Sequence, residues 1–170
     1  MAYQDDIKKA AALLLPWNKL SGCNILVTGA TGLIGGCLVD VLMAHKGRNY
    51  NVYASGRNEE RAGRRFLKYA DDNSFHFVKY DVAHPLEYDV NFQYIIHAAS
   101  GAYPEEFIKH PVEVIKGNIN GVDNLMGYGI QHGIKRLLYI SSGEVYGEGD
   151  GRVFTAVSYT HLRAHETLSD

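Results

Sequence analysis

Cysteine is scarce in this 170-residue sequence, which contains only Cys23 and Cys37. With no further pair to build a disulfide framework, we expect both thiols to be buried and reduced. The eight histidines include no H-E-x-x-H pattern, so their spacing gives no support for a metal site. We therefore predict no metal.

Long apolar runs and an excess of one charge are also missing. The longest apolar run near the N-terminus, Ala10 to Leu15, is far too short to span a bilayer. Asp5 and Asp6 precede it, where a signal peptide would carry positive charge. The net charge is −2, and the scattered Lys and Arg form no extended basic stretch of the kind that binds phosphate backbones. We expect a cytoplasmic protein that binds neither membranes nor nucleic acid.

The hydrophobic content of 46% is typical of one compact domain with a core. From Asn24 onward, short apolar runs alternate with longer amphipathic segments. The runs that we expect to be strands are Ile25–Val27, Val52–Ala54, Phe75–Lys79, Tyr94–His97 and Arg136–Ile140. The segments that we expect to be helices are residues 4–15, Leu33–His45, Glu59–Tyr69 and Val112–Gln131. This alternation predicts an α/β fold with a doubly wound parallel sheet of about five strands, covered on both faces.

A glycine-rich turn, TGATGLIG at Thr28–Gly35, follows the first expected strand and opens a helix. In such a turn Gly29 permits the sharp exit from the strand, Gly32 lets the backbone approach a pyrophosphate, and Gly35 lets helix and sheet pack closely. The helix N-terminus offers free N–H groups to the phosphates. A tight turn without a ligand is the alternative. The residues that we expect to bind a dinucleotide here are Gly29, Thr31, Gly32, Leu33, Ile34 and Gly35.

The spacing G-x-x-G-x-x-G resembles that of short-chain dehydrogenase/reductases, and further motifs follow in that family's order. These are Asp81-Val82, His97-Ala98-Ala99, the P-x6-N-x2-G-x2-N-L pattern of Pro111–Leu125, and SSGEVYG at Ser141–Gly147. Over roughly residues 23 to 150 the chain thus resembles the extended branch, the NAD-dependent epimerase/dehydratase family. The resemblance implies a Rossmann-type fold and an enzyme that binds NAD(P) and a nucleotide-sugar substrate.

The resemblance also implies roles for residues beyond the glycine-rich turn. Asp81 and Val82 would contact the adenine ring, and Ala98 and Ala99, with Ser141, would complete the cofactor site. Asp81 could instead be only a strand-end cap.

Ser142 and Glu144 are the catalytic candidates that the resemblance gives. Ser142 would hydrogen-bond the sugar oxygen, and Glu144 would serve in acid/base steps as in relatives that eliminate water or carbon dioxide. A buried strand-end hydroxyl is the alternative for Ser142. The S-x-E-V-Y-G turn is most similar to that of UDP-glucuronate decarboxylases, whereas Gly143 departs from the Asp of 4,6-dehydratases. For Tyr146 in this turn, and for His97, structural roles are favoured.

The end of the second strand bears on the choice of cofactor. An acidic residue there binds the ribose hydroxyl of NAD, whereas Arg pairs with the 2′-phosphate of NADP. Gly56 stands where the acid would be, and Arg57 follows it. We therefore favour NADP over NAD, with Arg57 as the phosphate ligand. The alternative is that Arg57 is a solvated residue at the start of a helix.

The family's catalytic Tyr-x-x-x-Lys pair does not follow Tyr146, and the pattern from Tyr159 to Arg163 has Arg in place of Lys. The segment AVSYTHLRAHET, Ala156–Thr167, resembles a translated sequencing-library transposase adapter. We expect a leading helix in residues 1–22, the N-terminal part of a cofactor domain in residues 23–155, and a non-native tail in residues 156–170. The C-terminal part of the fold would be missing and this fragment inactive, while the full-length protein would be a homodimeric enzyme. A non-catalytic NAD(P)-binding sensor or scaffold is the other hypothesis.

Overall fold

The computed structural model describes residues 2–100 and 104–142. The chain divides into two compact units, Met1–Tyr139 and Ile140–Asp170. The first contains a five-stranded sheet in the order β3-β2-β1-β4-β5, with every neighbouring pair parallel. The strands are β1 (Asn24–Thr28), β2 (Asn51–Gly56), β3 (Phe75–Lys79), β4 (Tyr94–His97) and β5 (Arg136–Tyr139). The predicted fold class and the predicted positions of the strands are confirmed.

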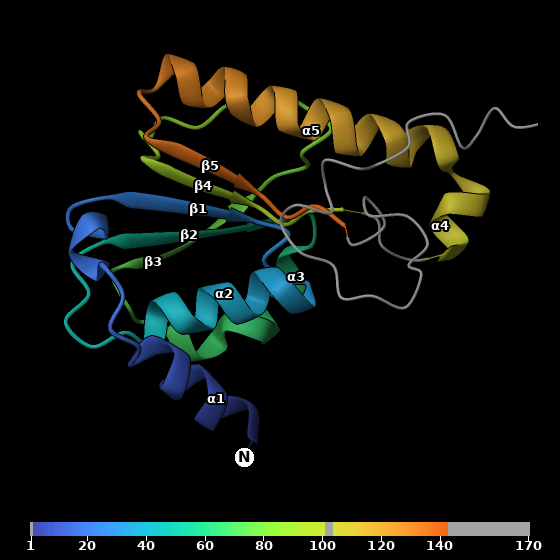
Figure 1. Ribbon diagram of the computed structural model, residues 1–170. Coiled ribbons are helices and arrows are strands. Elements are labelled where there is room, and N and C mark those ends of the chain that lie inside the picture. The colour runs from blue at the N-terminus through green and yellow to red at the C-terminus, as the bar shows by residue number, and fades with distance from the viewer. Residues whose placement is uncertain (1, 101–103, 143–170) are drawn as a thin grey trace, which may run out of the picture. The chain divides into compact units, whose positions relative to one another are not determined.

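Helices cover both faces of this sheet (Figure 1). The helices are α1 (Ala2–Ala11), α2 (Leu33–Ala44), α3 (Glu59–Phe66), α4 (Pro104–Lys109) and α5 (Pro111–Gln131), with short 3-10 turns η1 (Trp17–Leu20) and η2 (Leu67–Tyr69). Helices α2 and α3 lie on one face and α5 on the other (Figure 1). This arrangement follows from parallel pairing, because each connection must return along the sheet before the next strand begins.

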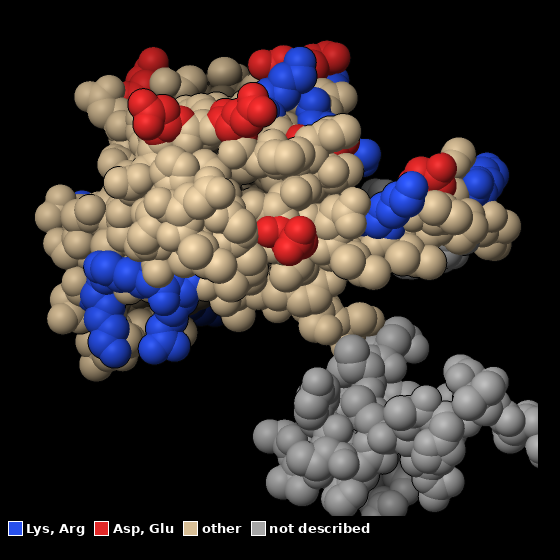
Figure 2. Space-filling model, turned by 90° about the horizontal axis from the view of Figure 1, so that it is seen from above, with Lys and Arg blue, Asp and Glu red and all other residues tan. Residues whose placement is uncertain are grey.

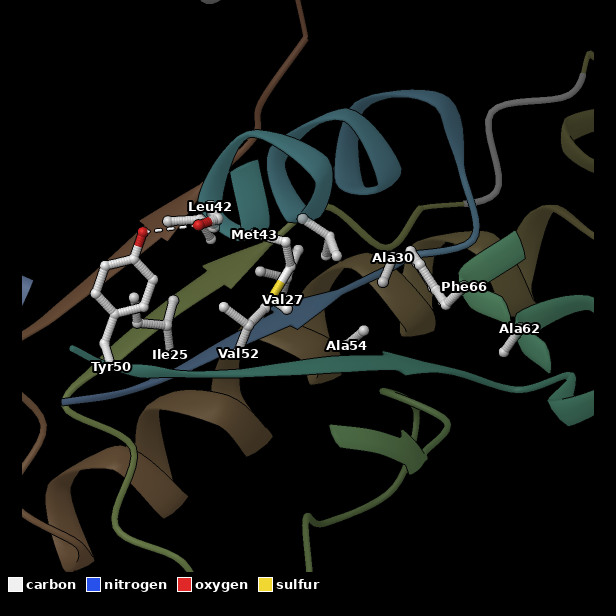
Figure 3. Close-up of a cluster of buried hydrophobic side chains, with 11 residues drawn as sticks. Ile25, Val27, Ala30, Leu42, Met43, Tyr50, Val52, Ala54, Ala62 and Phe66 are labelled. Atoms are coloured by element: carbon white, nitrogen blue, oxygen red, sulfur yellow. Dashed lines mark hydrogen bonds between the residues drawn. The ribbon is translucent and has the colours of Figure 1, made fainter. Parts of the chain in front are cut away.

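Alternate residues of the strands build two cores, one for each face. On the α2 side, Ile25 and Val27 of β1 pack with Val52 of β2 and Val39 of α2 (Figure 3). On the α5 side, Leu26, Ile95 and the α5 residue Leu125 belong to the second cluster. Both faces of β1 are therefore buried, which explains its uninterrupted apolar sequence.

The helices differ from the sequence expectation at three main places. The helix expected over Glu59–Tyr69 ends at Phe66, and the 3-10 turn η2 follows it. Helix α1 ends at Ala11, four residues before the expected end at Leu15. Pro16 follows that segment, and a residue before proline avoids helical dihedral angles. The short helix α4 (Pro104–Lys109) was not expected, because six residues are too few to show a helical period.

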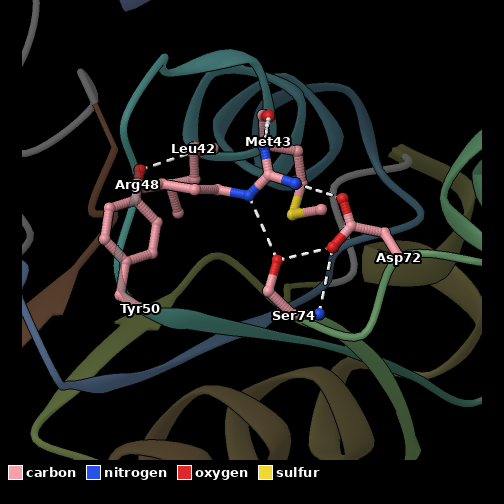
Figure 4. Close-up of polar contacts among 6 residues, drawn as sticks. All are labelled: Leu42, Met43, Arg48, Tyr50, Asp72 and Ser74. Atoms are coloured by element: carbon pink, nitrogen blue, oxygen red, sulfur yellow. Dashed lines mark hydrogen bonds and ion pairs between the residues drawn. The ribbon is translucent and has the colours of Figure 1, made fainter.

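A polar cluster around Arg48 lies at the end of the sheet where β2 and β3 begin (Figure 4). The Arg48 guanidinium donates to the backbone oxygen of Met43 at 2.6 Å and to Ser74 Oγ at 3.1 Å, and it forms an ion pair with Asp72. Asp72 Oδ1 accepts the Ser74 hydroxyl at 2.7 Å. This bond, the Ser74 amide and the charge of Arg48 hold the pKa of Asp72 below its ordinary value. The C-terminus of α2 is thereby joined to the turn before β3.

Asp40 on α2 is a fully buried carboxylate. Its Oδ2 accepts hydrogen bonds from Tyr3 Oη and from Arg65 Nη2, both at 2.6 Å. Its Oδ1 accepts from Tyr69 Oη at 2.9 Å and lies 2.9 Å from Lys68 Nζ. Burial alone would raise the pKa of Asp40, but these bonds favour the charged form and hold the pKa below its ordinary value. Asp40 thus ties α1, α3 and η2 to α2.

One side of α5 is apolar but exposed. Its large apolar residues are between 37% and 71% exposed, and they recur at helical spacing as Val112, Ile115, Ile119, Met126 and Ile130. Figure 2, which views the molecule from the α5 side, shows few charged side chains in the middle of this face. We call these five residues the α5 stripe. Among the described residues, no helix combines the length and apolar character needed to cross a bilayer.

Replacing Asp40 with Asn should lower the free energy of unfolding by about 3 kcal/mol at neutral pH, because Arg65 and Lys68 lose a buried partner. The folded pKa of Asp40 lies below the unfolded value of about 3.9. The carboxylate therefore stabilises the fold fully above about pH 5 and loses this contribution as the pH falls below about 4. Urea unfolding at pH 7 and at about pH 3 measures the difference between the two proteins, which should shrink at the lower pH.

The matched control for this variant is Glu60→Gln, which breaks an exposed ion pair with Arg64 at 3.5 Å. Exposed pairs contribute little, so this change should cost less than about 0.5 kcal/mol. An Asp40→Asn cost that is equally small, or that does not vary with pH, would contradict the role assigned to the buried carboxylate.

Candidate functional site

The glycine-rich turn lies between β1 and α2 and is in direct contact with the end of β4. Gly29 has φ +66°, a left-handed conformation that glycine adopts without a steric penalty. A Cβ at this position would lie 2.4 Å from the backbone oxygen of Ala98 and 2.7 Å from Cα of Ala99. The turn can therefore pass the β4 exit only as glycine, whereas the contact of Gly29 with a dinucleotide stays a prediction.

The first turn of α2 lies equally close to the backbone of Gly29. A Cβ at Gly35 would lie 2.4 Å from the backbone oxygen of Gly29. Gly32 is the N-cap of α2, and as a glycine it has no side chain to cap the helix N-terminus. Leu33 and Ile34, the first residues of the helix, are 87% and 52% exposed. Their amides therefore have no N-cap side chain as acceptor, as an anion site at a helix N-terminus requires.

The end of β2 joins the same turn. The Ala30 amide donates to the backbone oxygen of Ser55 at 3.0 Å, and a Cβ at Gly56 would meet Thr31 Oγ1 at an ordinary distance of 3.5 Å. Arg57 is exposed and immediately precedes Asn58, the N-cap of α3. The structure therefore brings Thr31 beside Gly56, while the cofactor contacts of Thr31 and Arg57 stay predictions.

Asp81 closes the turn that follows β3. Its Oδ1 accepts the Ala83 amide at 3.1 Å, and its backbone oxygen accepts the His84 amide at 3.1 Å. This is the capping role that was the alternative for Asp81. The adenine contact of Asp81 and Val82 stays a prediction beside it, since a carboxylate has acceptor capacity for more than one donor.

His97, the last residue of β4, is completely buried. Its Nδ1 lies 2.7 Å from Thr28 Oγ1, and burial lowers its pKa. Among the described residues its Nε2 has no hydrogen-bond partner. This neutral, inaccessible ring fits the structural role expected for His97. Ala98 and Ala99, which follow it, are half-buried beside the glycine-rich turn.

The catalytic candidates belong to a different part of the chain. Ser141 and Ser142 are exposed and lie in the second unit, Ile140–Asp170. Glu144 and Tyr146 lie outside the described residues. The roles of Ser141, Ser142 and Glu144 therefore stay predictions. Within residues 2–100 and 104–142, no cluster of His, Cys, Asp and Glu side chains could hold a metal ion.

Asn124 of α5 is a contact that the sequence interpretation did not assign. Its Nδ2 donates to the backbone oxygen of Val82 at 2.9 Å. The residue is the second Asn of the N-x2-G-x2-N-L pattern, in which Asn118 is the first. Asn118 Oδ1 accepts the Ser100 hydroxyl at 3.0 Å, just after β4. The motif pointed to both residues, but periodicity cannot show which strand each one meets.

Comparisons with known proteins agree with these observations. A family model described as the NAD dependent epimerase/dehydratase family matches residues 25–167. The chain is 33% identical over 132 residues to UDP-glucuronic acid decarboxylase 2 of Arabidopsis thaliana, an alignment that covers 76% of this chain and 28% of that protein. The chain therefore spans less than a third of that relative's length.

Solved structures share the fold. DesIV, a dTDP-glucose 4,6-dehydratase from Streptomyces venezuelae with NAD bound, matches with a TM-score of 0.67 and 22% identity over 79% of this chain and 44% of its own. A UDP-glucose-4-epimerase from Stenotrophomonas maltophila with bound NAD matches with a TM-score of 0.61 and 25% identity over 75% of this chain and 39% of its own.

Replacing Gly35 with Ala should destabilise the protein by about 1–3 kcal/mol, because the new Cβ meets backbone that cannot move aside without displacing the turn. The control is Gly63→Ala in α3, where a Cβ would meet nothing within 4 Å. That change should stabilise the fold by about 0.5–1 kcal/mol through helix propensity. Urea unfolding compares the two, and effects of the same sign would contradict the close approach at Gly35.

Proposed function

The chain belongs to the NAD-dependent epimerase/dehydratase family, and on this premise we propose that it is the NAD(P)-binding portion of an enzyme acting on a nucleotide sugar. The observation that carries the proposal is the turn from Gly29 to Gly35. Its backbone is pressed against the β4 exit, and its helix N-terminus has no side-chain cap. A dinucleotide pyrophosphate supplies the acceptors that such a helix end requires.

The residues present fit this cofactor. A Cβ at Gly29 or Gly35 would collide with backbone, so the cradle has the close packing that a dinucleotide turn needs. Leu33 and Ile34 would hold the pyrophosphate through their amides, while Gly32, whose own amide donates to the Gly29 backbone oxygen at 2.9 Å, would let it come close. Thr31 would contact the cofactor from its place beside Gly56. Asp81 and Val82 would meet the adenine, and Ala98 and Ala99 would form a wall of the cofactor cleft. Ser141 is proposed as a further cofactor contact from the resemblance alone.

The reaction that we propose passes through a ketone at C4 of the sugar. A bound cofactor would supply reversible hydride acceptance at C4. Ser142 would hold the C4 oxygen by a hydrogen bond, and the Tyr of a Tyr-x-x-x-Lys pair would take the proton of the C4 hydroxyl. The resulting ketone would labilise neighbouring bonds, where Glu144 would serve as acid or base. The same logic serves epimerases, dehydratases and decarboxylases, and the S-x-E-V-Y-G turn favours a decarboxylase among them.

A non-catalytic NAD(P)-binding sensor or scaffold is the second candidate function. The family to which the chain belongs favours the enzyme instead, and Tyr-x-x-x-Lys does not occur between Tyr146 and Asp170. The gene sequence after Thr155 distinguishes the two candidates. A Tyr-x-x-x-Lys pair encoded there supports the enzyme, and its absence supports the sensor or scaffold.

For the cofactor we propose NADP over NAD. Gly56 offers neither a side-chain acceptor for a ribose hydroxyl nor a charge that would repel a phosphate. Arg65 is bound to Asp40 and Arg64 pairs with Glu60, whereas the exposed Arg57 follows Gly56 directly. Arg57 is therefore the guanidinium best placed along the chain to pair with a 2′-phosphate.

For the full-length protein we propose a homodimer. The α5 stripe supports this, because exposed apolar residues at helical spacing are typical of a helix that packs against another helix. The molecular mass in solution, measured by light scattering on the full-length protein, tests it. A mass equal to one subunit would exclude the dimer.

The 170-residue chain should not turn over nucleotide sugars, because the Tyr/Lys pair needed for the hydride step is missing. The same chain continued past Thr155 by a natural segment containing that pair should act on one of the UDP-, dTDP-, GDP- or CDP-sugars, followed by chromatography. In that protein Ser142→Ala should lower kcat by about 100-fold, while Asn120→Ala on α5 should leave kcat unchanged. Turnover by the 170-residue chain itself would contradict the first expectation.

In the same continued protein, NADP should bind at least about ten-fold more tightly than NAD at low salt, because Arg57 and the 2′-phosphate form one charge-assisted pair. Arg57→Ala should remove most of this preference, and Gly56→Asp should reverse it, since position 56 accommodates a Cβ. Arg64→Ala, which affects an exposed pair with Glu60, is the control. Calorimetric titration of both nucleotides measures the preference, and equal affinities in the unaltered protein would argue against Arg57 as the phosphate ligand.

A further inference from the structure

The middle of α5 touches two neighbouring segments of the candidate cofactor site. A Cβ at Gly121 would lie 3.1 Å from His97 Nε2 and 3.3 Å from Val82 Cβ. The end of β4 and the turn after β3 therefore meet the helix at one point. Glycine at this position lets the helix backbone come close to both.

One turn further along α5, Asn124 makes a specific bond to the same turn. Its Nδ2 donates to the Val82 backbone oxygen at 2.9 Å, and the Asn124 side chain is half-buried. The turn itself is closed by bonds from the Ala83 and His84 amides to Asp81. Those bonds shape the turn internally, whereas the Asn124 bond holds it against a helix of the core.

We propose that Asn124 is a positioning residue that sets the place of the Asp81–Val82 turn and thereby the affinity for the adenosine half of the cofactor. The inference rests on the proposed cofactor site. Asn124 holds the Val82 carbonyl, and this fixes the position of Asp81 because Asp81 directly precedes Val82 in the chain. The Val82 carbonyl needs a hydrogen-bond donor at position 124. A side chain of similar size that has no donor should therefore not replace Asn124.

The experiment compares two near-isosteric variants of the present chain. Asn124→Leu removes the donor, and Asn124→Asp places a carboxylate against the Val82 carbonyl. Asn120→Leu, at an exposed position on the same helix, is the matched control. Calorimetry with ADP-ribose, which carries the adenosine half of the cofactor, should show about three- to ten-fold weaker binding for both Asn124 variants. The control should bind as the unaltered chain does.

Hydrogen exchange separates positioning from general loss of stability. In Asn124→Leu the amides of Ala83 and His84 should exchange faster, while those of β1 and α2 should keep their rates. A double variant with Asp81→Ala should bind ADP-ribose no more weakly than Asp81→Ala alone, because both changes act on one turn.

The outcomes distinguish this inference from the proposed function. If the unaltered chain binds ADP-ribose and Asn124→Leu binds it equally well, the positioning role is wrong and the cofactor site stands. Faster exchange throughout the sheet would mean that Asn124 supports the whole fold, which would also overturn it. If the unaltered chain does not bind ADP-ribose at all, the proposed cofactor site fails, and with it the affinity role of Asn124.

Discussion

The backbone contact between Gly29 and the Ala98–Ala99 segment is the constraint on which the candidate site depends. It brings the exits of β1 and β4 together with nothing but backbone between them. In the order β3-β2-β1-β4-β5, β1 and β4 are the neighbours at which the chain changes from one side of the sheet to the other. Open parallel sheets bind ligands at this point, outside the carboxyl ends of the strands. The contact therefore fixes where α2 begins and where its amides lie.

Hydrogen bonds and ion pairs, in addition to close packing, hold helix α2 to its neighbours further along its length. Asp40 collects two cations and two tyrosine hydroxyls from three other elements, and Arg48 fastens the C-terminus of the helix to the turn before β3. Helix α1, which supplies Tyr3, lies outside the range matched by the family model, yet it docks on the helix that carries the candidate phosphate site. A buried carboxylate with four partners keeps its charge because each partner favours the ionised form.

Helix α5 serves the same site from the opposite face. Its buried side follows the sheet, and its small and amide residues, Gly121 and Asn124, meet the turn after β3 and the last residue of β4. A helix that packs on both segments couples their positions, since the packed interior transmits a shift of one to the other. The exposed α5 stripe lies on a different side of this helix and gives it a second surface for contact.

The sequence alone determined the strand positions, the parallel sheet and the glycine-rich turn, because each rests on a local signal: apolar runs, alternation of elements and glycines at fixed spacing. It also indicated Gly29, Gly35 and the half-buried Ala98 and Ala99 as parts of one site. It could not show that α1 stops at Ala11, that α4 forms, or that Asp40 gathers Tyr3, Arg65 and Lys68. The bond from Asn124 to Val82 was equally hidden, because its partners are 42 residues apart. Such contacts depend on how helices lie across the sheet, and only the tertiary structure decided them, since hydrogen bonds between distant residues leave no period in the sequence.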